Sequence, residues 1–300
     1  MTEKEGSVPQ FPHPPNLEQL KKQARDLLDA YRAGQPDARR RIETYLPRIG
    51  VSGSTQGATS TVLLAHALFV VAREQGFPSW PKLKASSEAM AQRTERALDE
   101  ATRVAVPAGR EARTAFARER ASAAGLLARR QDVERLPRCL TSMALRDMLA
   151  VRSLLWENGD FSRVVDTLIL GLEHPQPAVR YCCAGALDHF GDERCVEPLR
   201  RLVADPVPRV RRVALHALGC DACKLMPWPR DCDAIVLFID RALNDTSITV
   251  RRHAASELDR YGHDPRVMGA LRLLADRESD PAILRGVDRA LRRHGRTAPA

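Results

Sequence analysis

The second half of the chain repeats one short pattern four times. Each copy has a turn, a short polar stretch, the pair Val-Arg or Leu-Arg, and a run of small residues that ends near a leucine. The copies begin 31, 40 and 35 residues apart, at His174, Asp205, Asp245 and Asp280. Repeats of this length are typical of helical arrays, in which each unit buries its apolar face against its neighbours. The sequence therefore predicts an all-α fold that ends in an α-solenoid.

The first helix of each repeat carries apolar residues at helical spacing, which predicts one buried face per helix. The four stripes are Val165/Leu168/Leu172, Val196/Leu199/Leu202, Val236/Ile239/Leu243 and Val267/Leu271/Leu274. The turn, the Val-Arg pair and the Ala-Leu-Gly ending together resemble HEAT repeats of the short bacterial type over roughly residues 160–295. The resemblance implies a ladder in which the arginine of one unit meets the turn aspartate of the next. Its members would be Arg180, Arg211, Arg251 and Arg285, with Asp205, Asp245 and Asp280.

The N-terminal part has the features of a separate helical module. Asn16 is a suitable helix cap, and Gly34 is suited to end the first helix. Two more helices are expected, at about Pro36–Tyr45 and Thr61–Gln75, followed by a turn that Phe77 and Trp80 would anchor in a small core. Segments 17–24, 32–34 and 72–84 resemble a leader module that precedes ankyrin or other helical repeats in many bacterial proteins. That resemblance implies a helical cap without catalytic residues.

Composition divides the chain into four parts. Residues 1–15 contain four prolines, which resist helix and strand, so a disordered arm is expected. The leader module spans 16–86, a helical connector or pair of degenerate repeats spans 87–158, and the HEAT-like array spans 159–296. The connector is rich in arginines, which are expected on solvated helix faces: Arg93, Arg96, Arg110, Arg113, Arg118, Arg120, Arg129 and Arg130.

The formal net charge of +9 would by itself favour an acidic partner such as nucleic acid. However, residues 1–130 hold 21 Lys and Arg against 14 Asp and Glu, whereas residues 131–300 hold 26 against 24. The predicted array is therefore nearly neutral. Apolar runs fall well short of the roughly 20 residues of a membrane span, and Met1–Pro15 lacks the apolar core of a secretory signal. A cytoplasmic protein is expected.

Seven cysteines without an export signal argue against a disulfide framework. Cys182 and Cys183 stand where other repeats have small core residues. The long second interval contains Cys220, Cys223 and Cys232, whose thiolates could hold Zn²⁺ or a metal cluster, with His216 as a further ligand. Packed thiols and a redox dithiol are the alternatives, because the second half of a zinc knuckle is missing.

The sequence contains none of the common catalytic signatures, such as Gly-x-Ser-x-Gly or a phosphate-binding Gly-x4-Gly-Lys. A non-enzymatic scaffold that binds a protein partner is therefore expected. Second helices normally line the concave face of such arrays, which gives six candidate contacts: Arg212, His216, Arg252, Glu257, Arg289 and Arg293. One alternative is a nucleic-acid-binding protein like the HEAT-like DNA glycosylases, although only Tyr181, Phe190 and Tyr261 offer aromatic rings there. The other is a protein of the bilin-lyase type, which the array resembles in repeat pattern only.

Overall fold

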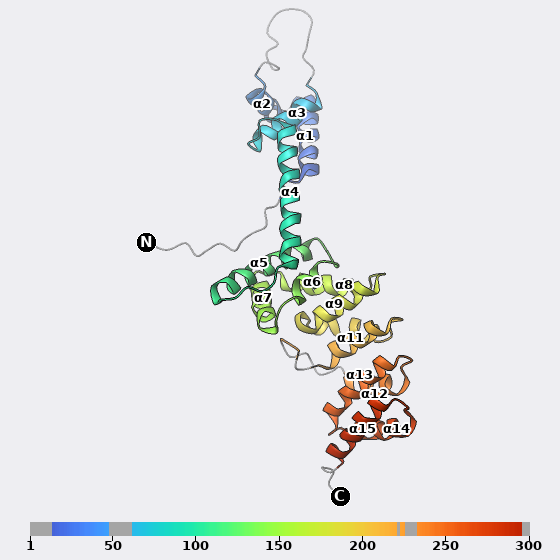
Figure 1. Ribbon diagram of the computed structural model, residues 1–300. Coiled ribbons are helices and arrows are strands. Elements are labelled where there is room, and N and C mark those ends of the chain that lie inside the picture. Colours follow the sequence, from blue (N-terminus) through green and yellow to red (C-terminus); the bar gives the residue numbers. More distant parts are fainter. Residues whose placement is uncertain (1–13, 48–61, 221–222, 226–232, 296–300) are drawn as a thin grey trace, which may run out of the picture. The chain divides into compact units, whose positions relative to one another are not determined.

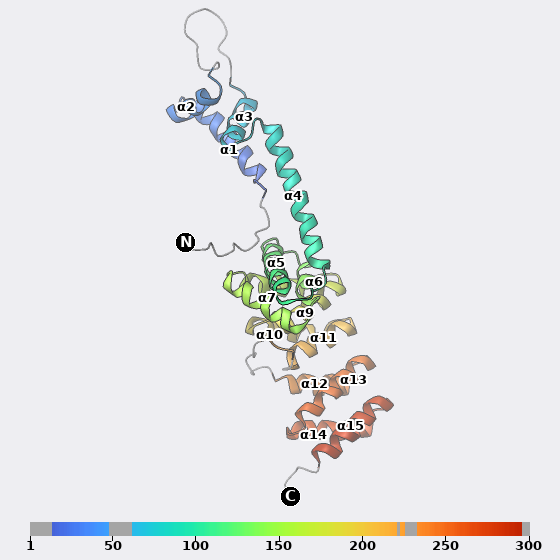
Figure 2. The ribbon, with the colours of Figure 1, turned by 60° about the vertical axis from the view of Figure 1, so that its left-hand side comes forward.

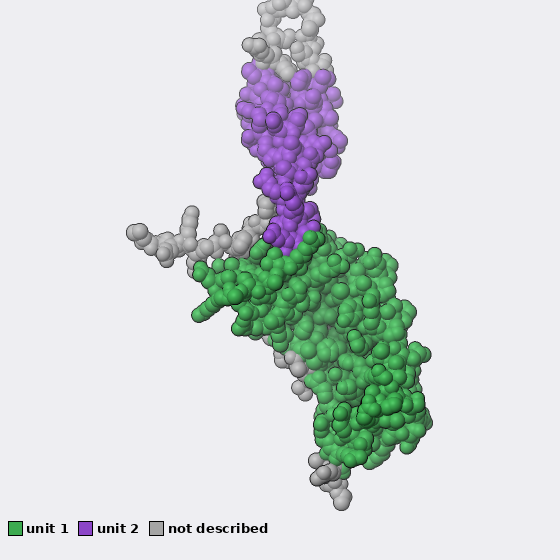
Figure 3. All heavy atoms as spheres, in the orientation of Figure 1, with its two compact units in different colours: residues 1–10, 101–300 green, residues 11–100 purple. Residues whose placement is uncertain are grey.

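The structure is a computed structural model that describes residues 14–47, 62–220, 223–225 and 233–295. All regular secondary structure in these ranges is helical, which confirms the all-α fold. The chain divides into two compact units, one holding residues 11–100 and the other residues 101–300 (Figure 3). Among the described helices, each is too short or too polar to cross a bilayer.

The unit of residues 11–100 contains α1 (Leu17–Arg32), α2 (Pro36–Tyr45), α3 (Leu64–Glu74) and most of α4 (Trp80–Arg103). Asn16 caps α1 as expected, because its side-chain oxygen accepts the N–H of Gln19 at 3.0 Å. Gly34 follows α1 with φ of 76°, a left-handed conformation that favours glycine. Leu27, Ile42, Val70 and Leu83 are among the fully enclosed residues of a core that all four helices share.

A short turn follows α3. Gly76 adopts φ of 81° and reverses the chain, and α4 begins already at Trp80. Phe77 and Trp80 are partly buried and pack against the core, as expected. The side chain of Ser87 on α4 donates to the carbonyl oxygen of Pro15 at 3.1 Å, which ties the start of the described chain to this helix.

The unit of residues 101–300 begins with α5 (Arg110–Arg129), α6 (Leu136–Thr141) and α7 (Leu145–Glu157). The prediction that the arginines here are solvated is wrong for Arg120, which is only 1% exposed. Its guanidinium donates to the carbonyl oxygens of Cys139 and Val104, at 2.9 and 2.7 Å, and to the hydroxyl of Ser142 at 3.0 Å. Buried peptide oxygens next to this position replace water around the charge, so the arginine belongs to the core.

Four helix pairs follow, each with a first and a second helix. They are α8 (Phe161–Gly171) with α9 (Pro177–Phe190), α10 (Val196–Leu202) with α11 (Pro208–Gly219), α12 (Ala234–Asn244) with α13 (Ile248–Leu258), and α14 (Pro265–Arg277) with α15 (Pro281–His294). The 3₁₀ turns η1 (Glu193–Cys195) and η2 (Asp259–Tyr261) precede α10 and follow α13. Proline occupies the first turn of α9, α11, α14 and α15, where its fixed φ suits the helix and its missing N–H costs nothing.

These pairs stack in chain order, as Figures 1 and 2 show from two directions. The second helices α9, α11, α13 and α15 contact one another in series, and the first helices α12 and α14 do the same. On α8 and α14 the predicted stripes are the buried faces, with all six residues at most 4% exposed. The predicted α-solenoid is therefore confirmed, and its core is a continuous layer between first and second helices.

The predicted stripe of α12 is wrong. Val236 is 50% exposed, and the buried residues of this helix are Phe238 and Ala242. The Phe238 ring packs directly over Gly219, the last residue of α11, at a spot where any side chain at 219 would overlap it. Because Gly219 has no side chain, the Phe238 ring fits against it. With Phe238 turned toward α11, Val236 on the same helix faces outward.

Candidate functional site

An arginine near the start of a second helix joins its own turn to the next repeat. In the first such link, Arg180 Nη1 donates to the carbonyl oxygens of His174 and Pro175, at 2.8 and 3.0 Å. Its Nε and Nη2 donate to the two carboxylate oxygens of Asp205, at 2.7 and 3.0 Å. Asp205 in turn accepts the N–H of Val207 at 2.8 Å, which fixes the turn that precedes the next second helix.

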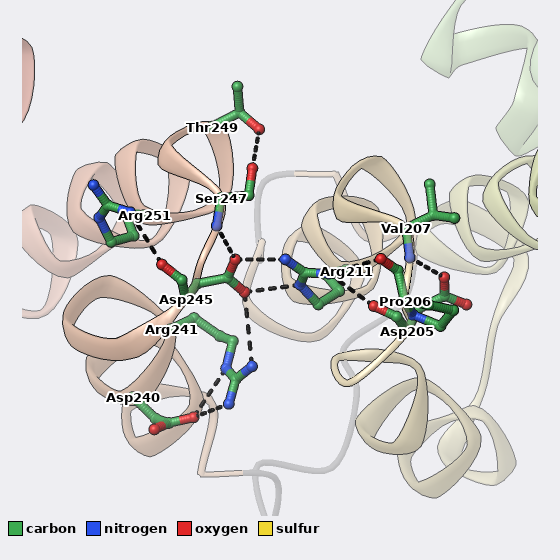
Figure 4. Close-up of polar contacts among 10 residues, drawn as sticks. All are labelled: Asp205, Pro206, Val207, Arg211, Asp240, Arg241, Asp245, Ser247, Thr249 and Arg251. Carbon is green, nitrogen blue, oxygen red and sulfur yellow. Dashed lines mark hydrogen bonds and ion pairs between the residues drawn. The ribbon is translucent and has the colours of Figure 1, made fainter.

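The second link repeats this geometry (Figure 4). Arg211 donates to the carbonyl oxygens of Asp205 and Pro206, at 2.8 and 3.3 Å, and bidentately to Asp245, at 2.8 and 2.6 Å. The side chains of Arg211 and Asp245 are only 9% and 1% exposed. Asp245 also accepts the N–H of Ser247 at 2.8 Å. The predicted ladder is therefore present between the repeats at α9, α11 and α13.

The third link differs from the prediction. Arg251 pairs with Glu278, at 2.9 and 3.4 Å, and the turn residue Asp280 pairs instead with Arg252, at 3.0 and 2.6 Å. The last turn carries a second carboxylate two residues before Asp280. That carboxylate, Glu278, pairs with Arg251, and Asp280 therefore pairs with Arg252, the next residue along α13. Arg285 is exposed and forms no ion pair within the described part of the chain.

The ladder arginines keep their carboxylates ionised. Partial burial raises the pKa of Asp245. The hydrogen bonds from Arg211 and the N–H of Ser247, with the charges of Arg211 and Arg241, together outweigh it and hold the pKa below its usual range. The hydrogen bond from Arg251 likewise lowers the pKa of Glu278. Arg252 lowers the pKa of Asp280 to about 2. These three carboxylates link neighbouring repeats. Because they stay ionised, they cannot donate or take up protons near neutral pH.

Four of the six predicted partner contacts lie on the last two second helices: Arg252, Glu257, Arg289 and Arg293. Arg252 on α13 and Arg289 on α15 both line a groove of about 220 Å³, together with Ser256 and Asp259. Arg293 pairs with Asp259 at 2.8 Å. Arg252 and Arg293 thus already have carboxylate partners, whereas Arg289 is exposed and makes no ion pair with a described residue.

The remaining two, Arg212 and His216, lie on α11, and Glu257 on α13 lies beside His216. Arg212 is exposed and forms no ion pair within the described ranges. His216 and Glu257 are partly buried, and they face each other and His253 closely enough for one donor atom of each to lie within 4.8 Å of the others. The structure therefore separates the predicted set into exposed arginines on the second helices and a partly enclosed histidine cluster.

This histidine cluster adjoins the cysteines of the long interval. Cys220 Sγ and Cys223 Sγ are 3.2 Å apart, and Cys223 Sγ is 3.4 Å from Nε2 of His216. The structure thus brings together two of the three cysteines predicted to bind metal and the histidine suggested as a further ligand. Cys232, the third predicted cysteine, lies outside the described residues.

The chain around Cys223 is fixed to two second helices. The carbonyl oxygen of Cys223 lies 2.8 Å from Nδ1 of His189 on α9. The next residue, Lys224, places its ammonium 2.6 Å from a carboxylate oxygen of Asp188, and both of these side chains are only 5% exposed. Asp188 Oδ2 also lies 3.4 Å from Nε2 of His216. Sequence reasoning missed Asp188 and Lys224, because neither stands in a motif and only stacking brings α9 beside the insert.

Electrostatics distinguish the two clustered thiols. Although burial raises the pKa of Cys220, hydrogen bonds from Cys223 and Arg260 lower it on balance. Burial, together with the neighbouring Cys220 sulfur, raises the pKa of Cys223 to about 12. The hydrogen bond with Asp188 raises the pKa of His216, whereas burial lowers the pKa of His253. The cluster therefore places one thiol with a lowered pKa beside a histidine with a raised pKa.

Of the other four described cysteines, three are buried in the core and the fourth is partly exposed. All six described cysteines are free, and burial raises the pKa of Cys139 to about 11 and of Cys183 and Cys195 to about 12. Cys183 is fully buried, as predicted for a small core residue, whereas its neighbour Cys182 is partly exposed. Only Cys220 and Cys223, among the described cysteines, lie beside nitrogen donors.

Comparison with protein families matches residues 165–232 to HEAT repeats. The matched segment runs from α8 into the cysteine-containing interval, and α12–α15 continue the same paired geometry beyond it. The match and the architecture together support a HEAT-repeat protein. No curated protein matches the chain.

Proposed function

We propose that the protein is a non-enzymatic HEAT-repeat scaffold that binds a protein partner along the side formed by its second helices. The observation that carries this proposal is the unbroken series α9, α11, α13 and α15, which presents Arg212 and Arg289 to solvent. Arginine is enriched at the energetic centres of protein interfaces because its planar group binds carboxylates bidentately. A partner segment that carries Asp or Glu side chains fits this surface.

The N-terminal unit fits the same proposal as an accessory module. We infer that residues 16–86 are a helical leader module of the kind found before bacterial helical repeats. The small core built by Leu27, Ile42, Val70 and Leu83 supports an independently folded cap. In this view the module extends the scaffold, and the array supplies the binding surface.

A nucleic-acid partner is less well supported. Proteins that bind flipped or single-stranded bases need exposed aromatic rings on which the bases stack. Of the rings expected on the second helices, Phe190 is fully buried and Tyr261 lies in η2, where it donates to a peptide oxygen. Tyr181 is exposed on α9. The bilin-lyase alternative rests on repeat pattern alone.

A co-purification experiment tests the scaffold proposal. The full chain is compared with the Arg212→Ala/Arg289→Ala double variant, and Arg272→Ala on the first helix α14 is the matched control because Arg272 is also exposed. We expect a partner that stays with the wild type and the control, and binds the double variant at least about tenfold more weakly. Equal retention of the partner by all three proteins would refute the assignment of Arg212 and Arg289 to the binding surface. Tight, salt-sensitive binding of duplex DNA at physiological ionic strength would instead favour the nucleic-acid alternative.

A further inference from the structure

Three metal-binding side chains converge where α11 ends and the long interval begins. Ligand atoms of His216, Cys220 and Cys223 all lie within 4.8 Å of one another. In a tetrahedral zinc site the metal lies about 2.3 Å from sulfur and about 2.1 Å from nitrogen, which places neighbouring ligand atoms about 3.5–3.8 Å apart. The distances of 3.2 Å between the sulfurs and 3.4 Å between Cys223 Sγ and His216 Nε2 are close to that spacing.

The next repeat offers a fourth donor beside His216: a ligand atom of His253 lies within 4.8 Å of those of His216 and Glu257. The ring of His253 on α13 lies 5.8 Å from the ring of His216, measured between centroids. Its Nε2 is enclosed by protein and has no hydrogen-bond partner among the described residues. An enclosed polar atom without a partner is costly, and coordination of a metal would remove that cost.

The site is held in place before any ligand arrives. The contact between Cys223 and His189 and the ion pair between Lys224 and Asp188 tie the cysteine to α9. His216 extends from α11, which packs directly against α13. Supporting contacts of this kind orient ligands and raise metal affinity.

We propose that Cys220, Cys223, His216 and His253 bind one zinc ion, with both thiols giving up their protons to solvent. Two sulfur and two nitrogen donors in a tetrahedral arrangement favour zinc over harder cations such as Mg²⁺ or Ca²⁺. The ion joins α11 to α13 across the longest interval between repeat starts, 40 residues, where the inserted chain separates one repeat from the next. This zinc site strengthens the array and does not depend on which partner the scaffold binds.

The test uses the full chain, purified with a thiol reductant that does not bind metals. Zinc is measured after dialysis, and Co²⁺ titration reports the geometry, because tetrahedral cobalt with thiolate ligands absorbs strongly in the visible range. We expect one bound zinc ion, loss of that ion in Cys223→Ser, and affinity at least about tenfold lower in His253→Gln. Cys182→Ser, a partly exposed thiol outside the cluster, is the control and should bind metal normally.

Several outcomes would overturn the assignment. They are wild-type protein that takes up no zinc when zinc is supplied, a Cys220–Cys223 disulfide in reduced preparations detected by mass, or full binding by Cys223→Ser. A Cys232→Ser protein that loses the metal while His253→Gln keeps it would overturn the fourth ligand. Far-ultraviolet circular dichroism of each variant separates lost binding from lost folding. A thermal midpoint that rises when zinc is added to wild type, and stays constant for Cys223→Ser, supports the joining of α11 to α13.

Discussion

Gly219, the last residue of α11, lies where the second helix pair meets α12 and η2 of the third. Its carbonyl oxygen accepts the hydroxyl of Tyr261 at 2.8 Å, and the Tyr261 ring stacks on Phe238 with 6.1 Å between centroids. The Phe238 ring covers the glycine so closely that a methyl group there would overlap ring atoms. The absence of a side chain at one position therefore decides how α11, α12 and η2 pack.

Replacing this glycine should destabilise the array. We expect Gly219→Ala to lower the free energy of unfolding by about 1–3 kcal/mol, because the added methyl group must displace the Phe238 ring from a filled core. Gly269→Ala on α14 is the matched control, since a methyl group there meets open space. It should be neutral or stabilising by up to about 1 kcal/mol, because alanine favours helix. Urea unfolding followed by circular dichroism measures both, and equal stability of the two variants would contradict the packing argument.

At the scale of the helix, the links between repeats are of two kinds. Arg211 and Asp245 form a pair that is nearly closed to solvent and also supports the turn oxygens of the preceding repeat. Arg252 reaches Asp280 with half of its side chain exposed. When one partner of an enclosed pair is removed, the other charge stays buried without compensation. Where a pair is exposed, water takes the place of the missing partner.

Removing the arginine should therefore lower the stability of the array more in the enclosed Arg211 link than in the half-exposed Arg252 link. We expect Arg211→Met to lower the free energy of unfolding by about 2 kcal/mol, because Asp245 and two turn carbonyl oxygens lose their donor. Arg252→Met keeps the aliphatic stem and should cost less than Arg211→Met, because the Arg252 side chain is half exposed, although Asp280 itself is only 6% exposed. Denaturant titration of both variants beside the wild type checks the difference. A larger loss in Arg252→Met than in Arg211→Met would show that the ladder does not act as described.

On the scale of the molecule, the array depends on ionised carboxylates. The pKa values of Asp245, Glu278 and Asp280 are lowered by their arginines, so the folded state binds protons less readily than the unfolded chain. Their contribution to stability is complete above the ordinary carboxyl pKa, near about 4, and is lost as pH falls below it. For Asp280, whose pKa is about 2, the loss ends only in strong acid.

Acid should accordingly lower the stability of the wild type more than that of a chain that lacks the Asp245 carboxylate. We expect the thermal midpoint of the wild type to stay level between neutral pH and about pH 5, and then to fall steeply toward about pH 3. Asp245→Asn should begin at a lower midpoint and fall less over the same range, because one of the titrating groups is gone. Calorimetry at constant ionic strength measures this. A wild-type midpoint that rises on acidification would contradict the assignment.

Much of the fold could be predicted from the sequence because the signals are local. The α2 helix at Pro36–Tyr45, the cap at Asn16 and the links from Arg180 and Arg211 all follow from residues close together in the chain or from a repeated pattern. Periodicity and turn chemistry act over one or two helical turns, and a repeat shows the same contact several times.

The amino-acid pattern by itself thus determined that helices pair and stack, and the resemblance it carries pointed to the links from Arg180 and Arg211. Only the tertiary structure decided that Arg120 is enclosed, that Val236 faces outward, and that Asp280 takes Arg252. It also decided that His253 and Asp188 lie near His216, beside the Cys220–Cys223 pair. These outcomes depend on the rotation of each helix about its axis and on neighbours from other repeats. That rotation is set by the fit of whole side chains in the core, which no short stretch of sequence contains.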